Sequence, residues 1–306
     1  MFDRITGQVK LMIRKVVGRS VQGASHIRSN TKCQDSHKIV LNDDLIIIAV
    51  ADGHGSKSCP YSDSGSKMAV NTFCSLISRL YEAYADNSDQ LITYLKRDGE
   101  DKIAKTIDYE WKEKVLKCHK RNLREIPKDE EGKDNLSAVY QQYGTTLLGL
   151  AIFDGFLFAF QLGDGDICYV TEQNVEMIIC PEKILGVETH SLSKKDSWKS
   201  VITTVQRINI DQDLPVIFTL SSDGFSNSYK SETDFHNTLI EYLGMIKEHG
   251  LDAVEENLQG WLNETSEMGS GDDITLCIAF YSEEQNNQFP AQNTEESEIV
   301  RNEKCE

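Results

Sequence analysis

The spacing of short apolar runs along the chain constrains the fold more than any other feature. Eight runs rich in Ile, Val, Leu and Phe have the length of β-strands. They are residues 37–41, 45–51, 145–153, 156–162, 166–171, 174–180, 216–222 and 274–281. Three connections are short enough for hairpins: Asn42 to Asp44, Asp154-Gly155 and Gly163 to Asp166. Such connections favour antiparallel pairing, because parallel strands need long crossovers.

Helical periodicity lies between and after the strands. One stretch places apolar residues three to four positions apart, at Val70, Phe73, Ile77, Leu80 and Tyr84. A second repeats every fourth residue, at Ile103, Ile107, Trp111 and Val115. Two more helices are expected at 233–247 and 251–266. This order predicts an α+β fold with two packed antiparallel β-sheets flanked by helices, an αββα sandwich, and not a doubly wound parallel sheet.

The composition fits one large acidic domain. A chain of 306 residues with 39% hydrophobic content can bury one substantial core. A formal net charge of -17 repels nucleic acid and attracts divalent cations. The eight cysteines form no CxxC pair and are interpreted as buried or free thiols in a reducing cytosol. Because the N-terminus has no signal-peptide core and no apolar run is long enough to cross a bilayer, a cytoplasmic protein is expected.

The two ends of the chain differ from its body. Residues 1–20 carry five positive charges and one negative charge, and we assign them to a basic N-terminal extension. Their apolar residues, such as Leu11 and Val16, fit a first strand or helix packed on the body better than a contact with a membrane or an acidic partner. Residues 282–306 hold seven glutamates among Asn, Gln and Ser, which predicts a disordered acidic tail. The folded domain is therefore expected to span 21–281.

Aspartates stand at the ends of several expected strands. Asp52, Asp164 and Asp223 follow strands, and Asp272 and Asp273 directly precede one. Carboxylates at strand ends can converge on one point, where their mutual repulsion requires cations. Oxygen ligands of this kind favour Mg²⁺ or Mn²⁺ over zinc.

An Asp-Gly pair after a strand is, taken alone, an ordinary turn. Asp154-Gly155 is interpreted in that way. Four strand-end sites with the same pattern are harder to explain as turns, because a turn does not require every apolar run to end on Asp. The pattern therefore predicts a shared site.

Six motifs then identify a family resemblance. In chain order they are Gln34-Asp35, Asp52-Gly53-His54-Gly55, Gly144-Thr145-Thr146, Gly163-Asp164-Gly165-Asp166, Ser222-Asp223-Gly224 and Gly271-Asp272-Asp273. Together they resemble the 2C-type, metal-dependent serine/threonine protein phosphatases of the PPM family, over about residues 20–281. The Gln-Asp pair, the Asp-Asp pair and Glu188-Thr189-His190-Ser191-Leu192 are closer to the bacterial branch.

The resemblance implies a site for two cations. Asp52 would bridge the two ions, the Gly53 carbonyl would bind one of them, and Asp223 with Asp272 would complete the shell of the other. Asp164 with Asp223 matches a third, weaker ion of the family. Hydroxide bridging the two ions would attack phosphorus directly, so no phosphoenzyme intermediate is needed.

The resemblance also implies three further catalytic roles. Asp35 would orient a metal-bound water, and His54 would protonate the seryl or threonyl leaving oxygen. Arg28 is the candidate to hold the substrate phosphate. It stands farther before Asp35 than the family pattern expects. Gln34, Asp273 and Asp166 also depart from the pattern, where glutamate, asparagine and arginine are frequent, and none of the three departures removes a direct ligand.

Three functions remain open at this point. The first is an active protein phosphatase whose partners are phosphorylated proteins, including a cognate Ser/Thr kinase or its targets. The second is a catalytically weak relative that binds phosphoproteins as a regulatory module. The third is a hydrolase of small phosphate monoesters. The complete set of Asp52, Asp223 and Asp272 favours an active enzyme.

Overall fold

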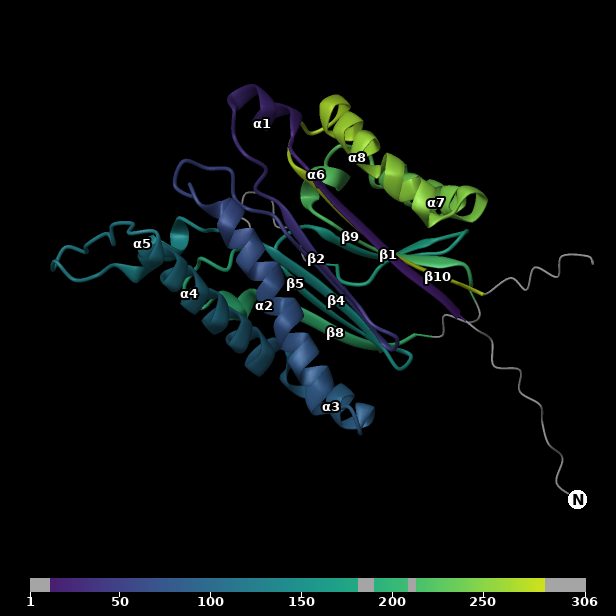
Figure 1. Ribbon diagram of the computed structural model, residues 1–306, viewed down its shortest axis with the longest axis horizontal. Helices are drawn as coiled ribbons and strands as arrows, with labels where there is room; N and C mark the ends of the chain where they lie inside the picture. Colours follow the sequence, from purple (N-terminus) through teal and green to yellow (C-terminus); the bar gives the residue numbers. More distant parts are fainter. Residues whose placement is uncertain (1–11, 181–189, 209–212, 284–306) are drawn as a thin grey trace, which may run out of the picture.

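A computed structural model describes residues 12–180, 190–208 and 213–283. Two five-stranded antiparallel sheets pack against each other (Figure 1). The first sheet has the order β1 (Met12–Val21), β10 (Ile274–Glu283), β9 (Val216–Ser221), β6 (Asp166–Val170) and β7 (Val175–Met177). The second has the order β2 (Ser36–Leu41), β3 (Leu45–Ala51), β4 (Leu147–Phe153), β5 (Phe156–Leu162) and β8 (Ile202–Arg207). The α+β sandwich expected from the sequence is confirmed.

Helices cover the outer face of each sheet (Figure 1). The second sheet carries α2 (Ser62–Ala83), α3 (Ser88–Asp98), a π-helical turn (Gly99–Ile103), α4 (Ala104–Arg121) and α5 (Leu136–Gln141). The first carries α7 (Glu232–His249) and α8 (Leu251–Met268). Short segments complete the fold: α1 (Ala24–Ser29), α6 (Asp223–Ser226) and a 3₁₀ turn (Ser197–Ser200). The Ser231 hydroxyl caps α7 by accepting the Asp234 N–H, one reason why the helix begins there.

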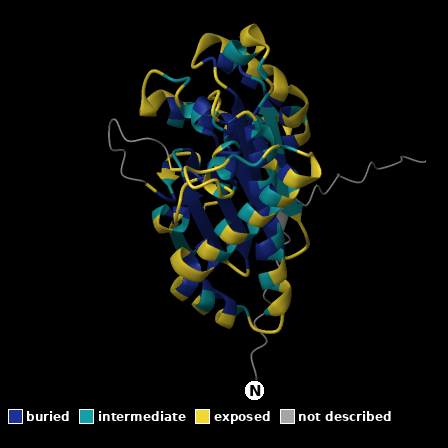
Figure 2. Cartoon of the chain, turned by 90° about the vertical axis from the view of Figure 1, so that its left-hand side faces the viewer, coloured by how far each residue is buried: buried dark blue, intermediate teal, exposed yellow. Residues whose placement is uncertain are grey.

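Alternating side chains of the strands build three apolar layers. In β3, Ile46, Ile48 and Val50 face the other sheet, while Ile47 and Ala49 pack with the helices. A third layer joins the first sheet to α7 and α8. Both faces of the central strands are therefore buried (Figure 2). This burial explains why β3 is a continuous apolar run.

One expected hairpin is wrong. The connection from Gly163 to Asp166 does not pair β5 with β6, because these strands belong to different sheets. The chain crosses between the sheets there. A Cβ at Gly165 would lie 2.4 Å from the Ser221 oxygen, so only glycine allows this close crossing. Asp164 is consequently placed between the two sheets, whereas the hairpins at Asn42 to Asp44 and at Asp154-Gly155 are confirmed.

Both ends of the domain extend beyond the boundaries drawn from the sequence. Strand β1 pairs with β10 from Met12 to Val21, so the boundary at residue 20 divides a strand, and the interpretation as a first strand holds. Strand β10 includes the first two residues assigned to the tail, Ser282 and Glu283. The rest of the tail and residues 1–11 lie outside the described residues. Within the described ranges, no helix is long and apolar enough to span a membrane.

Candidate metal centre

Carboxylates from both sheets meet where strands end. Asp52 follows β3, Asp223 follows β9 and opens α6, and Asp272 precedes β10 by one residue. Burial raises the pKa of Asp52 well above its ordinary value, and the negative charges of Asp35, Asp223 and Asp272 raise it further. Asp35, Asp223 and Asp272 therefore lie close enough to Asp52 for their negative charges to act on it.

The backbone of Asp52 is fixed by the two threonines directly before β4. Its carbonyl accepts hydrogen bonds from the Thr145 hydroxyl and from the Thr146 N–H, each 2.8 Å long. The Asp52 N–H donates to the Thr146 hydroxyl at 2.9 Å. The Gly-Thr-Thr motif thus holds the aspartate in position. Gly53 is equally constrained, because a Cβ there would lie 2.6 Å from the Gln34 carbonyl oxygen.

Burial also raises the pKa of two other carboxyl groups of the cluster. Burial raises the pKa of Asp35 to about 7, despite the 2.7 Å hydrogen bond that its Oδ2 accepts from Ser222. Asp35 Oδ1 is buried without a hydrogen-bond partner in the described part of the chain. Burial, followed by the negative charge of Asp164, raises the pKa of Asp223 to about 6. The Asn227 amide donates to Asp223 Oδ2 at 3.0 Å.

This donor set fits hard divalent cations. It consists of carboxylate oxygens that repel one another, one buried oxygen that lacks a hydrogen bond, and a glycine carbonyl beside them. Among the described residues, no three His, Cys, Asp or Glu side chains already surround one point as a formed metal shell. The cluster is thus a group of interacting carboxylates that bound cations would draw together and neutralise.

Asp273 has a supporting role that the sequence did not reveal. Its buried Oδ1 accepts hydrogen bonds from the Gly23 N–H at 2.6 Å and from His26 Nδ1 at 2.8 Å. Its Oδ2 accepts the Gln34 N–H at 2.7 Å. An asparagine could not accept on both side-chain atoms, so the departure from the family pattern has a structural reason. Asp273 holds the segment that leads into Asp35.

Sequence reasoning also missed His26. Its Nε2 lies 3.8 Å from Asp272 Oδ1, and its Nδ1 contacts Asp273. The signal was its position in the sequence, since His26 stands two residues before Arg28. Arg28 is exposed on α1 and makes no ion pair with a described residue. Arg28 lies on a short helix beside the cluster. Its role in holding the substrate phosphate stays a prediction.

His54 is half-buried next to Gly144. The His54 N–H donates to the Gly144 carbonyl at 3.0 Å, and a Cβ on Gly144 would lie 2.7 Å from His54 Cδ2. The absence of a side chain at Gly144 therefore makes room for the imidazole. The ring lines a cavity of about 340 Å³.

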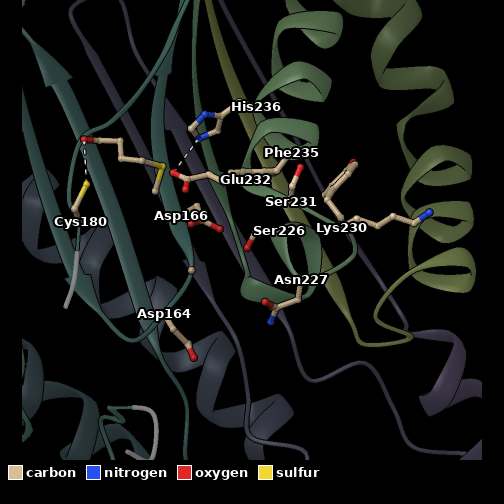
Figure 3. A pocket seen from close by; sticks show the side chains of 13 residues that line it. Asp164, Asp166, Cys180, Ser226, Asn227, Lys230, Ser231, Glu232, Phe235 and His236 are labelled. Atoms are coloured by element: carbon tan, nitrogen blue, oxygen red, sulfur yellow. Dashed lines mark hydrogen bonds and ion pairs between the residues drawn. The ribbon is translucent and has the colours of Figure 1, made fainter. Parts of the chain in front are cut away.

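A second cavity, of about 530 Å³, opens beside Asp164 (Figure 3). Asp166, Ser226 and Asn227 line it together with Asp164. Since Asn227 also contacts Asp223, this cavity borders the carboxylate cluster. The negative charge of Asp164 raises the pKa of Asp223, and the role of this pair in holding a third ion stays a prediction.

The family model described as Protein phosphatase 2C matches residues 22–263. The chain belongs to this family. Its members are serine/threonine protein phosphatases, so the enzyme class expected from the motifs is confirmed. No curated protein matches the phosphatase in a sequence search.

Solved structures agree with the family assignment. A bacterial serine phosphatase is 16% identical, with a TM-score of 0.55, and the match covers 88% of this chain and 98% of that one. The catalytic domain of the serine/threonine phosphatase PstP, in complex with two manganese ions, is 14% identical with a TM-score of 0.52, covering 89% and 100%. The serine/threonine phosphatase of S. agalactiae is 14% identical with a TM-score of 0.51, covering 88% and 99%. At these identities the likeness shows the fold alone, and the bacterial branch stays a prediction.

The raised pKa values predict how pH affects the metal-free phosphatase. Asp35 and Asp223 have folded pKa values of about 7 and about 6, above the ordinary 3.8. Between these values the folded state binds more protons than the unfolded state, so the free energy of unfolding should fall as pH rises from about 4 to about 7. In chelator, the melting temperature should be lower at pH 8 than at pH 5.5, and Mn²⁺ should restore it at pH 8.

A matched variant isolates the carboxylate effect. Burial lowers the pKa of His37. This shift has the opposite effect on the free energy of unfolding, which rises with pH as His37 loses its proton in the unfolded state. The pH dependence of the wild type should therefore be compared with that of Asp35→Asn, which keeps His37. Identical pH profiles for the two proteins would contradict the burial of an ionisable Asp35.

Proposed function

We propose that this phosphatase hydrolyses phosphoserine and phosphothreonine in proteins with two Mg²⁺ or Mn²⁺ ions held by Asp52, the Gly53 carbonyl, Asp223 and Asp272. The observation that carries the proposal is the repulsion at Asp52, where burial and three neighbouring carboxylates raise the pKa together. Keeping all of these groups charged near neutral pH requires cations. When bound, the ions supply a nucleophile from water and stabilise the attacking and leaving oxygens.

Asp35 is proposed to orient the attacking water. Ser222 fixes one carboxylate oxygen, which leaves the buried Oδ1 to accept a hydrogen bond. Direct attack by water needs no protein nucleophile, so no Cys or Ser takes part in the reaction. Asp164, with Asp223, is proposed to hold a third ion at the edge of the cavity in Figure 3.

His54 is proposed to donate the proton that a seryl or threonyl oxygen needs in order to leave. Its ring is half-buried beside Gly53 and lines a cavity, so a substrate oxygen can approach it. Arg28 is proposed to contact the phosphate oxygens of the substrate. The exposed position of this side chain on α1 leaves it accessible to a phosphoprotein.

The proposed partners are phosphorylated proteins, including a cognate Ser/Thr kinase or its targets, and the proposed setting is the cytoplasm. Seven cysteines of the described ranges are free, which suits a reducing compartment. The resulting role is in signalling by serine/threonine dephosphorylation.

Metal dependence is the direct test. Hydrolysis of a phosphothreonine peptide should require millimolar Mg²⁺ or Mn²⁺ and should disappear with chelator, because oxygen-ligand sites hold these ions weakly. Adding Mn²⁺ back should restore the rate. Full activity after exhaustive chelation would exclude the cation mechanism. Turnover of small phosphate esters without turnover of any phosphopeptide would favour the small-molecule alternative, and binding without turnover would favour the regulatory one.

A further inference from the structure

The cavity beside His54 has a lining unlike the rest of this acidic protein. Its nine described lining residues include Lys194, Lys195, His54, Gln141 and four serines, and none of the nine is Asp or Glu. The whole chain carries 49 acidic residues against 32 basic ones. We call this cavity the lysine cavity. Its ammonium, imidazole, amide and hydroxyl groups can all donate hydrogen bonds, which suits an anion.

The wall that carries the two lysines is tied to the candidate metal centre. The Leu192 N–H donates to the Thr145 carbonyl at 3.0 Å, and the Thr145 N–H donates to the Ser191 hydroxyl at 3.1 Å. Thr145 in turn donates its hydroxyl to the Asp52 carbonyl at 2.8 Å. The segment before the lysines therefore has a fixed position relative to Asp52.

The floor of the cavity is closely packed around Gly144. A Cβ on Gly144 would meet His54 Cδ2 at 2.7 Å, Cys59 Sγ at 3.2 Å and Ser193 Oγ at 3.3 Å, so three lining residues converge on this glycine. Ser193 is buried and bonds Ser191 through the two hydroxyl groups at 3.0 Å. The lysine cavity is thus a formed pocket that shares His54 with the proposed catalytic machinery.

The 530 Å³ cavity beside Asp164 has the opposite character. It is lined by Asp164, Asp166 and Glu232, with Lys230 and His236 (Figure 3). Acidic groups of a substrate would be repelled there and attracted to the lysine cavity. An extended peptide advances roughly 3.3–3.6 Å per residue, so a side chain in the lysine cavity belongs within a few residues of the one that His54 contacts.

We propose that the lysine cavity is a substrate subsite for an anionic side chain, acidic or phosphorylated, close in sequence to the phosphoserine or phosphothreonine being hydrolysed. This inference rests on the proposed function. Lys194 and Lys195 supply the charge, and the serines and Gln141 supply hydrogen bonds. The net charge of -17 would by itself favour basic peptides, so a preference for acidic peptides identifies a local site.

The test uses four peptides with one phosphothreonine core. The three positions on each side carry Glu, Ser or Lys, and a fourth peptide carries a second phosphoserine. With Mn²⁺, kcat/KM should be highest for the anionic peptides and lowest for the Lys peptide. A larger preference for the doubly phosphorylated peptide identifies phosphate as the better ligand, and an equal preference shows that a carboxylate is enough. Both results support the subsite.

Substitutions place the effect in the cavity. Lys194→Ser and Lys195→Ser should each lower the ratio of kcat/KM between the Glu and Ser peptides by roughly threefold, and the double variant by about tenfold, as expected for partly exposed ion pairs. Lys195→Glu should shift the preference toward the Lys peptide, a gain that misfolding cannot produce. Lys199→Ser is the matched control, because it removes the same charge from a lysine that pairs with Asp196 and does not line the cavity.

Binding separates this inference from the proposed function. Dissociation constants of the labelled peptides, measured by fluorescence anisotropy in chelator, should follow the same order without any turnover. If wild-type kcat/KM and Kd do not distinguish Glu, Ser and Lys peptides, the subsite is wrong even if Mn²⁺-dependent hydrolysis stands. If no peptide is hydrolysed but the order of Kd holds and depends on Lys194 and Lys195, the proposed function fails and the anion site remains.

Discussion

Asp52→Asn and Asp223→Asn are each expected to lower turnover of a phosphothreonine peptide by about 10²–10³-fold or more, the loss typical of removing one preorganised electrostatic group from an active site. Both carboxylates lie in the buried cluster, and the negative charge of Asp223 is one of the causes that raise the pKa of Asp52. Removing one negative charge weakens cation binding and changes its geometry. Rates are to be measured at saturating Mn²⁺, so that weaker cation binding is not mistaken for a slower chemical step.

The fold should survive these changes, because neutral Asn relieves repulsion in the metal-free protein. Asp154→Asn is the matched control: it makes the same chemical change at a strand-end Asp-Gly that lies in the β4–β5 hairpin. Its left-handed backbone, with φ of 49°, is one that Asn tolerates. Near wild-type turnover by either cluster variant at saturating metal would contradict the site assignment.

His54→Gln is expected to have the second largest effect, and one that depends on the substrate. A seryl or threonyl alkoxide needs a proton to leave, whereas a nitrophenolate does not. Turnover of a phosphothreonine peptide should therefore fall by roughly 10² or more relative to turnover of p-nitrophenyl phosphate. Metal affinity should change little, since the imidazole is not proposed as a ligand.

His249→Gln provides the control, because this histidine is exposed at the end of α7, away from the lining of either cavity beside the cluster. Equal losses of His54→Gln on both substrates would indicate a structural or metal-binding role for His54. An unchanged rate on both would leave it an ordinary loop residue next to Gly144.

Local patterns predicted most of the strands and long helices of this protein. Strand β3 is recognisable because both of its faces are buried, so its sequence is continuously apolar. Strand β8 was missed because it is an edge strand whose Thr203, Thr204 and Gln206 give no apolar run. Strand β1 remained ambiguous because charged residues such as Arg14 and Lys15 interrupt it, as is common at sheet edges.

The sequence by itself determined which residues can carry the chemistry: aspartates stand where strands end, and strand ends follow from local turn and apolar patterns. Only the tertiary structure decided how they are used. Pairing partners of a strand are chosen by burial across the whole domain, so the turn at Gly163 to Asp166 became a crossover that places Asp164 between the sheets. The tertiary structure likewise decided that Asp273 accepts hydrogen bonds from Gly23, His26 and Gln34. Contacts between residues more than 200 positions apart leave no trace in local spacing.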